Sequence, residues 1–187
     1  METERFEALI DAILAIIITI IVLEIPLASN GSWQALLDIK YEFIIYAISF
    51  MICFNFWNFN NNIFSIVNKV DPKVIWTMGL TLFVFSLLPY LTTFVAENFY
   101  DFFPQFLYGL IFIATAIFSL IIGRFLKGAD PGNIALHVAL KDQSAMYFTI
   151  ILVVVGIAIG YYAYPPAIML CCLISILGVW ILPKIRG

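Results

Sequence analysis

Charge is scarce in this chain. Only 11% of its 187 residues are charged, 64% are hydrophobic, and the mean hydropathy is +1.06. Water-soluble domains are about one quarter charged and about half apolar, so the composition excludes that class. The net charge of −3 is too small to indicate a nucleic-acid partner. The apolar residues form runs of about 20, the length that spans a lipid bilayer, and predict a polytopic membrane protein.

Groups able to do chemistry are also scarce. The single histidine, His137, lies in a polar connecting stretch, and the three cysteines, Cys53, Cys171 and Cys172, lie inside apolar runs. Such thiols are poor candidates for zinc or a disulfide. The sequence has no CxxC pair, no glycine-rich phosphate loop and no Ser/His/Asp set. We therefore expect no enzyme activity, no cofactor and no resident metal.

Six apolar segments are separated by turn residues such as Asp71-Pro72 and Pro165-Pro166. They span about residues 6–27, 41–67, 73–96, 104–126, 144–163 and 166–183. The first begins with the acidic METERFE and is too long for a signal peptide, so it is interpreted as a true membrane helix. The pattern predicts an all-α integral membrane protein with six transmembrane helices in one domain, residues 1–187. A kink is expected at Pro89, within the third segment.

The basic residues give the expected orientation. Only Lys40 falls on one side of the six-span arrangement; the other side carries Arg5, Lys69, Lys73, Arg124, Lys127, Lys141, Lys184 and Arg186. Cytoplasmic loops are enriched in Lys and Arg, so both termini are predicted to be cytoplasmic.

The first segment carries an aliphatic stripe. At 100° per residue, one face of the helix carries Ala12, Ile16, Thr19, Ile20, Leu23 and Leu27. Core packing or lipid contact explains such a stripe in most membrane helices, and Thr19 can equally bond its own backbone carbonyl. Asp11 points away from the stripe, whereas Glu24 lies at the outer end.

Asp11 needs a partner, because a carboxylate within a membrane helix is usually paired or functional. The second segment ends in FNFWNFNNNIF, and its last turns return to the depth of Asp11. Trp57, Asn60 and Asn61 offer N–H donors there. We expect this network to fix the rotation of the first helix.

These same two stretches resemble a known family. The run from Arg5 to Asp11, RFEALID, resembles the signature Arg-x-x-x-Phe-Ser-Asp of the transmembrane protein 175 family of potassium channels. The run from Trp57 to Phe64, WNFNNNIF, is similar to its Trp-x-x-His-His-x-x-Phe, with Asn60 and Asn61 in place of the histidines.

The resemblance implies a homotetramer whose four first helices line a pore for K+. By position, Ile16 would form the innermost constriction, Ile20 and Leu23 the next rings, Thr19 a ring of hydroxyls, and Glu24 the pore mouth. Arg5 would join Asp11 and the second-helix residues in the structural network. A single repeat without targeting signals indicates a bacterial plasma membrane.

The chain has no TVGYG-like filter, so a narrow aliphatic ring that gates by dewetting is the expected device. A secondary transporter of a small cation or solute is the alternative. It would normally place ionisable residues near the middle of the membrane, where these segments are apolar.

Overall fold

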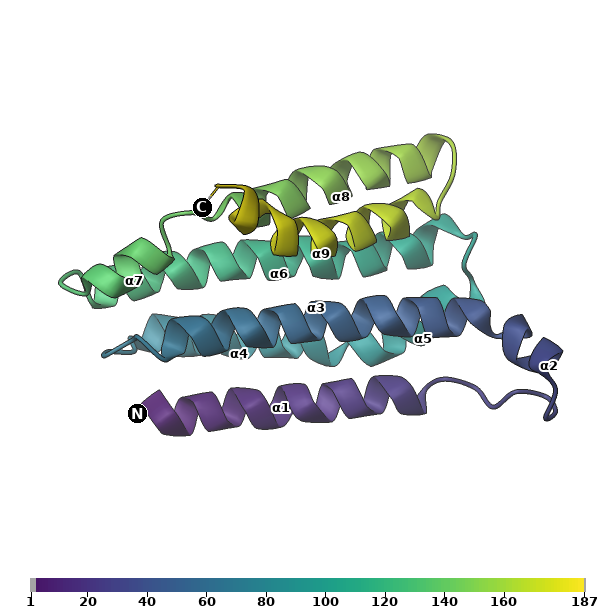
Figure 1. Cartoon of the computed structure of the whole chain (residues 1–187), viewed down its shortest axis with the longest axis horizontal. Coiled ribbons are helices and arrows are strands. Elements are labelled where there is room, and N and C mark those ends of the chain that lie inside the picture. Colours follow the sequence, from purple (N-terminus) through teal and green to yellow (C-terminus); the bar gives the residue numbers. More distant parts are fainter. Residues whose placement is uncertain (1–2, 187) are drawn as a thin grey trace.

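The computed structural model describes the backbone of residues 3–186 and the side chains of residues 5–178. Within that part of the chain every regular element is an α-helix, and the long helices lie side by side as a bundle (Figure 1). The helices are α1 (Thr3–Leu23), α2 (Trp33–Asp38), α3 (Lys40–Phe64), α4 (Pro72–Ser86), α5 (Leu88–Glu97), α6 (Phe102–Ala129), α7 (Ile134–Ala139), α8 (Ser144–Tyr162) and α9 (Ala167–Arg186).

Five stretches of the described chain are long and apolar enough to cross a membrane. They are Arg5–Leu23, Lys40–Phe64, Pro72–Glu97, Phe102–Ala129 and Ile134–Tyr162. They overlap the first five predicted segments, although the first stretch ends at Leu23 rather than near residue 27 and the fifth begins at Ile134, in α7, rather than near residue 144. In α9 the described apolar part, Ala167–Gly178, is shorter. The remaining side chains of the predicted sixth segment, and those of the flanking Lys184 and Arg186, lie outside the described residues, so the sixth span stays a prediction.

The predicted kink in the third segment is confirmed as a break between α4 and α5. Leu87 separates the two helices, and Pro89 lies in the first turn of α5. Proline has no N–H to donate and its ring clashes with the preceding turn, which explains the interruption. At the break the Leu87 N–H donates to the Val84 carbonyl oxygen, 3.2 Å away, in a tighter turn.

Two short helices were not expected from the sequence. The Ser32 hydroxyl oxygen caps α2 by accepting from the Ala35 N–H at 3.1 Å. The Asn133 side chain does the same for α7, accepting from the Leu136 N–H at 3.0 Å. Such caps satisfy N–H groups that the first turn of a helix leaves unpaired. Each short helix lies at one end of the bundle (Figure 1).

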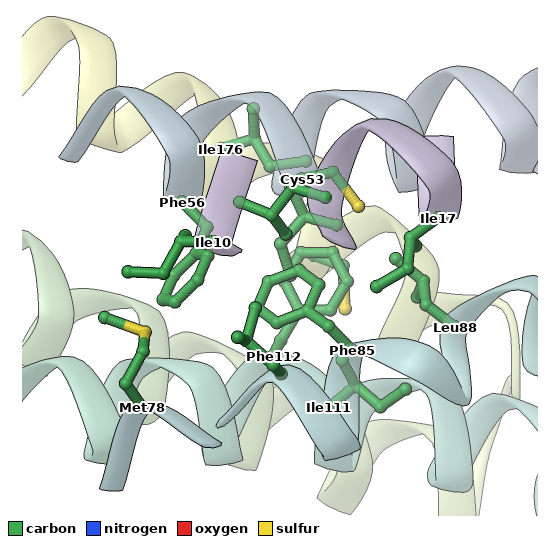
Figure 2. Close-up of a cluster of buried hydrophobic side chains, with 14 of the residues drawn as sticks. Ile10, Ile17, Cys53, Phe56, Met78, Phe85, Leu88, Ile111, Phe112 and Ile176 are labelled. Atoms are coloured by element: carbon green, nitrogen blue, oxygen red, sulfur yellow. The ribbon is translucent and has the colours of Figure 1, made fainter. Parts of the chain in front are cut away.

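The core is a continuous cluster of apolar side chains drawn from nearly every long helix. Figure 2 shows Ile10 and Ile17 of α1 facing Phe56 of α3 and Phe85 of α4. Helix association in a membrane depends on close packing and on internal hydrogen bonds, because lipid is as apolar as the core itself.

A buried hydrogen-bond network crosses this core. The Ser49 hydroxyl of α3 lies 2.8 Å from the Thr92 hydroxyl of α5 and 2.7 Å from the Tyr108 hydroxyl of α6. Ser49 and Tyr108 are fully buried, and Thr92 is 4% exposed. The network therefore joins three helices just beside the α4–α5 break.

Helices α8 and α9 approach each other closely at two glycines. A Cβ added to Gly156 would lie 2.8 Å from the Cβ of Cys171 and 3.3 Å from the Cα of Ile168. A Cβ added to Gly160 would lie 2.9 Å from the Ile168 side chain. Residues 156–160 read GIAIG, the spacing of small residues that lets two membrane helices touch through their backbones.

Candidate pore-lining helix

Helix α1 has two distinct faces. Its buried face packs on α3, α4 and α5 and consists of Phe6, Ile10, Leu14, Ile17 and Ile21, each 4% exposed or less. The predicted stripe is on the opposite side, roughly 130° around the helix at 100° per residue. In the single chain Ile16 is 58% exposed, Ile20 39% and Leu23 80%. The aliphatic stripe is therefore not part of the core of this chain, which excludes one of the two ordinary explanations for it.

Thr19 lies on the same exposed face. Its hydroxyl donates a hydrogen bond to the Ile16 carbonyl oxygen, 2.8 Å away. This is the bond to its own backbone that the sequence analysis gave as one alternative. A hydroxyl has one hydrogen and two lone pairs, so this bond uses the hydrogen and leaves the oxygen free to accept. The exposed oxygen of Thr19 can therefore turn its negative end outward from α1, toward a cation or water.

The expected stripe is too long by one residue. Helix α1 ends at Leu23, so Leu27 does not continue the helical face as the wheel predicted. Pro26 is the physical reason, because a proline disfavours helical geometry in the residue before it. Glu24 follows directly after the last residue of α1 and is exposed.

Two other glutamates lie close to Glu24, and the sequence analysis did not predict them. Glu24, Glu42 of α3 and Glu97 of α5 line a recess of about 60 Å³ at this end of the bundle. One carboxylate oxygen of Glu42 is buried without a hydrogen-bond partner in the described part of the chain. The only signal in the sequence was that all three residues fall at span ends on the same side. Within the described residues, no three His, Cys, Asp or Glu side chains gather closely enough to hold a metal ion.

Two contacts tie α1 to α3 at the opposite end. The Trp57 indole N–H donates to the Asp11 carboxylate over 2.9 Å. One turn of α1 earlier, the rings of Phe6 and Phe64 pack edge to face with centroids 5.6 Å apart. Two contacts spaced along both helices resist rotation of α1 about its own axis.

The other residues expected in this network lie elsewhere. Asn60 is 3% exposed, and its amide donates to the Phe56 carbonyl oxygen of its own helix at 2.7 Å. Its side-chain oxygen is buried without a partner among the described residues. Arg5 and Asn61 are exposed. Asn60 lies about 100° around α3 from Asn61, on the buried side of the helix, where its amide bonds to the backbone of its own helix.

A second polar cluster holds two loops together at the same end as Asp11. The Asn133 amide donates to the Ile66 carbonyl oxygen at 2.7 Å and to the Asp130 carboxylate at 3.1 Å. Asn68 also donates to Asp130, at 3.2 Å. These bonds lower the pKa of Asp130, with the Asn133 bond as the largest cause. The loop after α3 is thus fastened to the loop after α6.

Comparisons with known proteins point to one family. The sequence profile described as "Endosomal/lysosomal potassium channel TMEM175" matches residues 5–89. Potassium channel HX13_20290 of Chryseobacterium sp. (strain P1-3) is 32% identical over 186 residues, covering 100% of this chain and 96% of the relative. Potassium channel Cha6605_3372 of Chamaesiphon minutus is 32% identical over 127 residues, covering 62% of each chain.

The fold has a counterpart among solved structures. The crystal structure of a lysosomal potassium-selective channel TMEM175 homolog from Chamaesiphon minutus superposes with a TM-score of 0.81 at 24% identity. The match covers 96% of this chain and 97% of that one. Because a full-length relative is 32% identical and the family profile matches the first helices, the chain belongs to the TMEM175 family of potassium channels, which is not a family of enzymes.

Proposed function

We propose that this chain forms a homotetrameric, potassium-preferring cation channel in which α1 of each copy lines a central pore. The observation that carries the proposal is the exposed aliphatic stripe of Ile16, Ile20 and Leu23, interrupted by the hydroxyl of Thr19. Lipid would cover such a stripe equally well. Four copies around one axis would instead turn it into stacked rings around a pore, with the same residues at the same height.

The rotation of α1 supports this assignment. Phe64 of α3 packs on Phe6, which lies on the buried face of α1, and Trp57 bonds to Asp11, which is exposed beside that face. Each copy would then present the same face to the axis. Within the described residues the hydrogen bond to Asp11 comes from Trp57, so the proposed lock is built on the Asp11–Trp57 pair and the ring pair beside it, with Arg5, Asn60 and Asn61 around them.

The proposed mechanism is dewetting at an aliphatic constriction. Water and ions leave a hydrophobic passage when it becomes narrow enough, and return when it widens. In this scheme Ile16 forms the innermost ring, with Ile20 and Leu23 outward of it. Thr19 lies between these rings, and its free oxygen lone pairs replace part of the water around a cation. K+ gives up hydration water more readily than Na+, so K+ is favoured.

The outer mouth would be acidic. Four copies of Glu24 raise the local concentration of cations through their combined negative potential. Glu42 and Glu97 beside it in each copy support the same role.

The proposed topology has six spans in one domain over residues 1–187, with both termini in the cytoplasm. The basic residues support this topology. The side of the bundle where α1 begins (Figure 1) carries the helix ends and loops that contain Arg5, Lys69, Arg124 and Lys141. Lys40 stands at the other end. The positive-inside rule then places the α1 start in the cytoplasm. The bacterial origin of the relatives supports a bacterial plasma membrane.

Reversal potentials test the proposal directly. Purified protein is placed in planar bilayers with K+ on one side and Na+ on the other, and the expected potential shifts toward the K+ equilibrium value. Thr19→Ala should reduce that shift. Ile16→Thr should increase the current by wetting the constriction, whereas Val22→Thr, an exposed branched residue off the stripe, is the matched control and should leave it unchanged.

Two results would contradict the proposal. An equal effect of Ile16→Thr and Val22→Thr would mean that the stripe faces lipid. Slow, saturable uptake in vesicles without single-channel currents would instead favour the transporter alternative, and Asp11 and Glu24 would become the residues to examine.

A further inference from the structure

Helix α5 packs on the buried side of α1, away from the exposed stripe. Its first residue, Leu88, is fully buried, and in Figure 2 its side chain lies beside Ile17 of α1 in the core cluster. One turn farther along both helices, Ile21 of α1 and Thr92 of α5 line the same small recess. Ile17 follows Ile16 directly, so the two differ in height along α1 by only about 1.5 Å. Leu88 therefore supports α1 from behind at the height proposed for the innermost constriction.

The position of α5 is not set by a continuous backbone helix. The break at Leu87 separates α5 from α4, and Pro89 in the first turn of α5 has no N–H to offer to the preceding turn. The direction of α5 relative to α4 therefore depends on contacts that its side chains make with other helices. The hydroxyl network of Tyr108, Ser49 and Thr92 supplies such contacts from α6 and α3.

Only one order of donors uses every hydrogen of this network. The Thr92 hydroxyl lies 2.7 Å from the Leu88 carbonyl oxygen, which can only accept. Each hydroxyl has a single hydrogen, so Thr92 donates to Leu88, Ser49 donates to the Thr92 oxygen, and the Tyr108 hydroxyl donates to Ser49. In the reverse order the Tyr108 hydrogen would be buried without an acceptor in the described part of the chain. The network thus runs from α6 through α3 to the first residue of α5.

The bonds of the network depend on one another through Ser49. Its oxygen accepts from Tyr108, while its hydrogen goes to Thr92. Without the Tyr108 donor, the Ser49 oxygen is left unsatisfied in the core, and its hydroxyl can turn to donate to the backbone of its own helix. Thr92 then loses its bond to α3. Loss of either end of the network therefore frees α5 from the helices that position it.

We propose that Tyr108, Ser49 and Thr92 are positioning residues for ion conduction, and that their network keeps α5 against α1 in the narrow state of the pore. The inference rests on the proposed function, in which α1 lines the pore. With the network formed, Leu88 keeps α1, through Ile17, close to the pore axis. When the network breaks, α5 turns at the α4–α5 break, α1 moves back, and the constriction widens and becomes wetted.

Single-channel recording of the full chain in planar bilayers tests this role. Tyr108→Phe and Thr92→Val each break the network. Each should raise the ratio of open to closed time about threefold, the equivalent of one average hydrogen bond between membrane helices. The double variant should stay near about threefold, below the product of about ninefold expected for independent sites, because both changes act through Ser49.

A conservative variant and the ion preference separate positioning from loss of structure. Thr92→Ser keeps the hydroxyl and should restore the parent ratio of open to closed time. The K+/Na+ reversal potential should be the same in all variants, because the Thr19 hydroxyl and the exposed face of α1 are unchanged.

Two matched controls remove hydroxyls that do not join α5 to another helix. Thr115→Val removes a buried hydroxyl that donates to the Ile111 carbonyl oxygen of its own helix at 2.7 Å. Tyr90→Phe removes the hydroxyl of an exposed tyrosine of α5. Both variants should keep the parent ratio of open to closed time.

Three results would overturn the inference and leave the proposed pore intact. An unchanged ratio in Tyr108→Phe and Thr92→Val would mean that the network stabilises the fold alone. A rise of the same size in Thr115→Val would trace the effect to a general loss of stability. A double variant at the product of the single effects would mean that the bonds act independently of one another.

An absence of current in the parent protein would instead contradict the proposed function. Amide hydrogen exchange in lipid nanodiscs then tests the positioning of α5 without ion conduction. The backbone amides of α5 should exchange faster in Thr92→Val than in Thr115→Val, because only the first change releases α5 from α3. Equal exchange in the two variants would overturn the inference.

Discussion

Gly156 offers the sharpest test of how the helices pack. Substitution by alanine would place the new Cβ 2.8 Å from the Cβ of Cys171 and 3.3 Å from the Cα of Ile168. The second atom belongs to the backbone, so a side-chain rotation cannot relieve the contact and α9 must move. Overpacking of this kind costs about 1–3 kcal/mol.

The helix-propensity gain from glycine to alanine, about 1 kcal/mol, acts in the opposite direction and must be subtracted. Gly79 in α4 is the matched control, because an added Cβ there would meet nothing within 4 Å. Gly79→Ala should show the propensity gain alone. The difference between the two variants is then the packing cost itself, about 1–3 kcal/mol.

Thermal unfolding of the two variants in one detergent measures this difference. At about 2–4 °C per kcal/mol for a chain of this size, Gly156→Ala should melt about 2–12 °C below Gly79→Ala. Gly156→Ala should cost less when it is made in a Cys171→Gly background, because the nearest atom is then absent and the helix-propensity cost of Cys171→Gly is the same in both chains compared. Equal melting temperatures for the two alanine variants would refute the reasoning, since they would show that α9 yields without cost.

Three further predictions concern polar groups. Tyr108→Phe removes the hydrogen bond to Ser49 and should lower the free energy of unfolding by about 0.6 kcal/mol, the average for such bonds in membranes. The melting temperature should therefore fall, and an unchanged melting temperature would contradict the prediction. Glu24→Gln should reduce single-channel conductance at 10 mM salt and not at 150 mM, where the Debye length is about 8 Å; a salt-independent effect would exclude focusing. The pKa of Asp130 is lowered below 3.8 by bonds from Asn133 and Asn68, so the carboxylate stabilises the fold above that pH and loses the effect as pH falls through its lowered pKa. The melting-temperature gap between the parent and Asp130→Asn should shrink in that range, and a constant gap would be contrary to expectation.

The locations of the membrane helices followed from composition alone, because a bilayer requires about 20 apolar residues in each span. The Pro89 break was equally local, since proline acts on its own turn of helix. The short helices α2 and α7 were missed. Their caps, Ser32 and Asn133, are residues that the sequence displays, but six-residue helices carry too little periodicity to be distinguished from loops.

The stripe on α1 was visible in the sequence as a helical face, but its exposure was not. Whether Ile16 faces the core depends on which side of α1 packs on α3, α4 and α5. Residues far away in the chain determine that side. Phe64 contacts Phe6, and Trp57 donates a hydrogen bond to Asp11, and these two contacts set the rotation of α1. The same periodicity would have been obtained for a helix rotated by half a turn.

Sequence by itself determined the all-helical membrane class, the first five spans and the resemblance to a channel family, because each depends on hydrophobicity or short motifs along the chain. Tertiary structure decided that Trp57 meets Asp11 of α1, and that Glu42 and Glu97 stand beside Glu24. It also brought Ser49, Thr92 and Tyr108 together. These groups come from helices separated by tens of residues, and only the packing of whole helices sets the distances between their side chains.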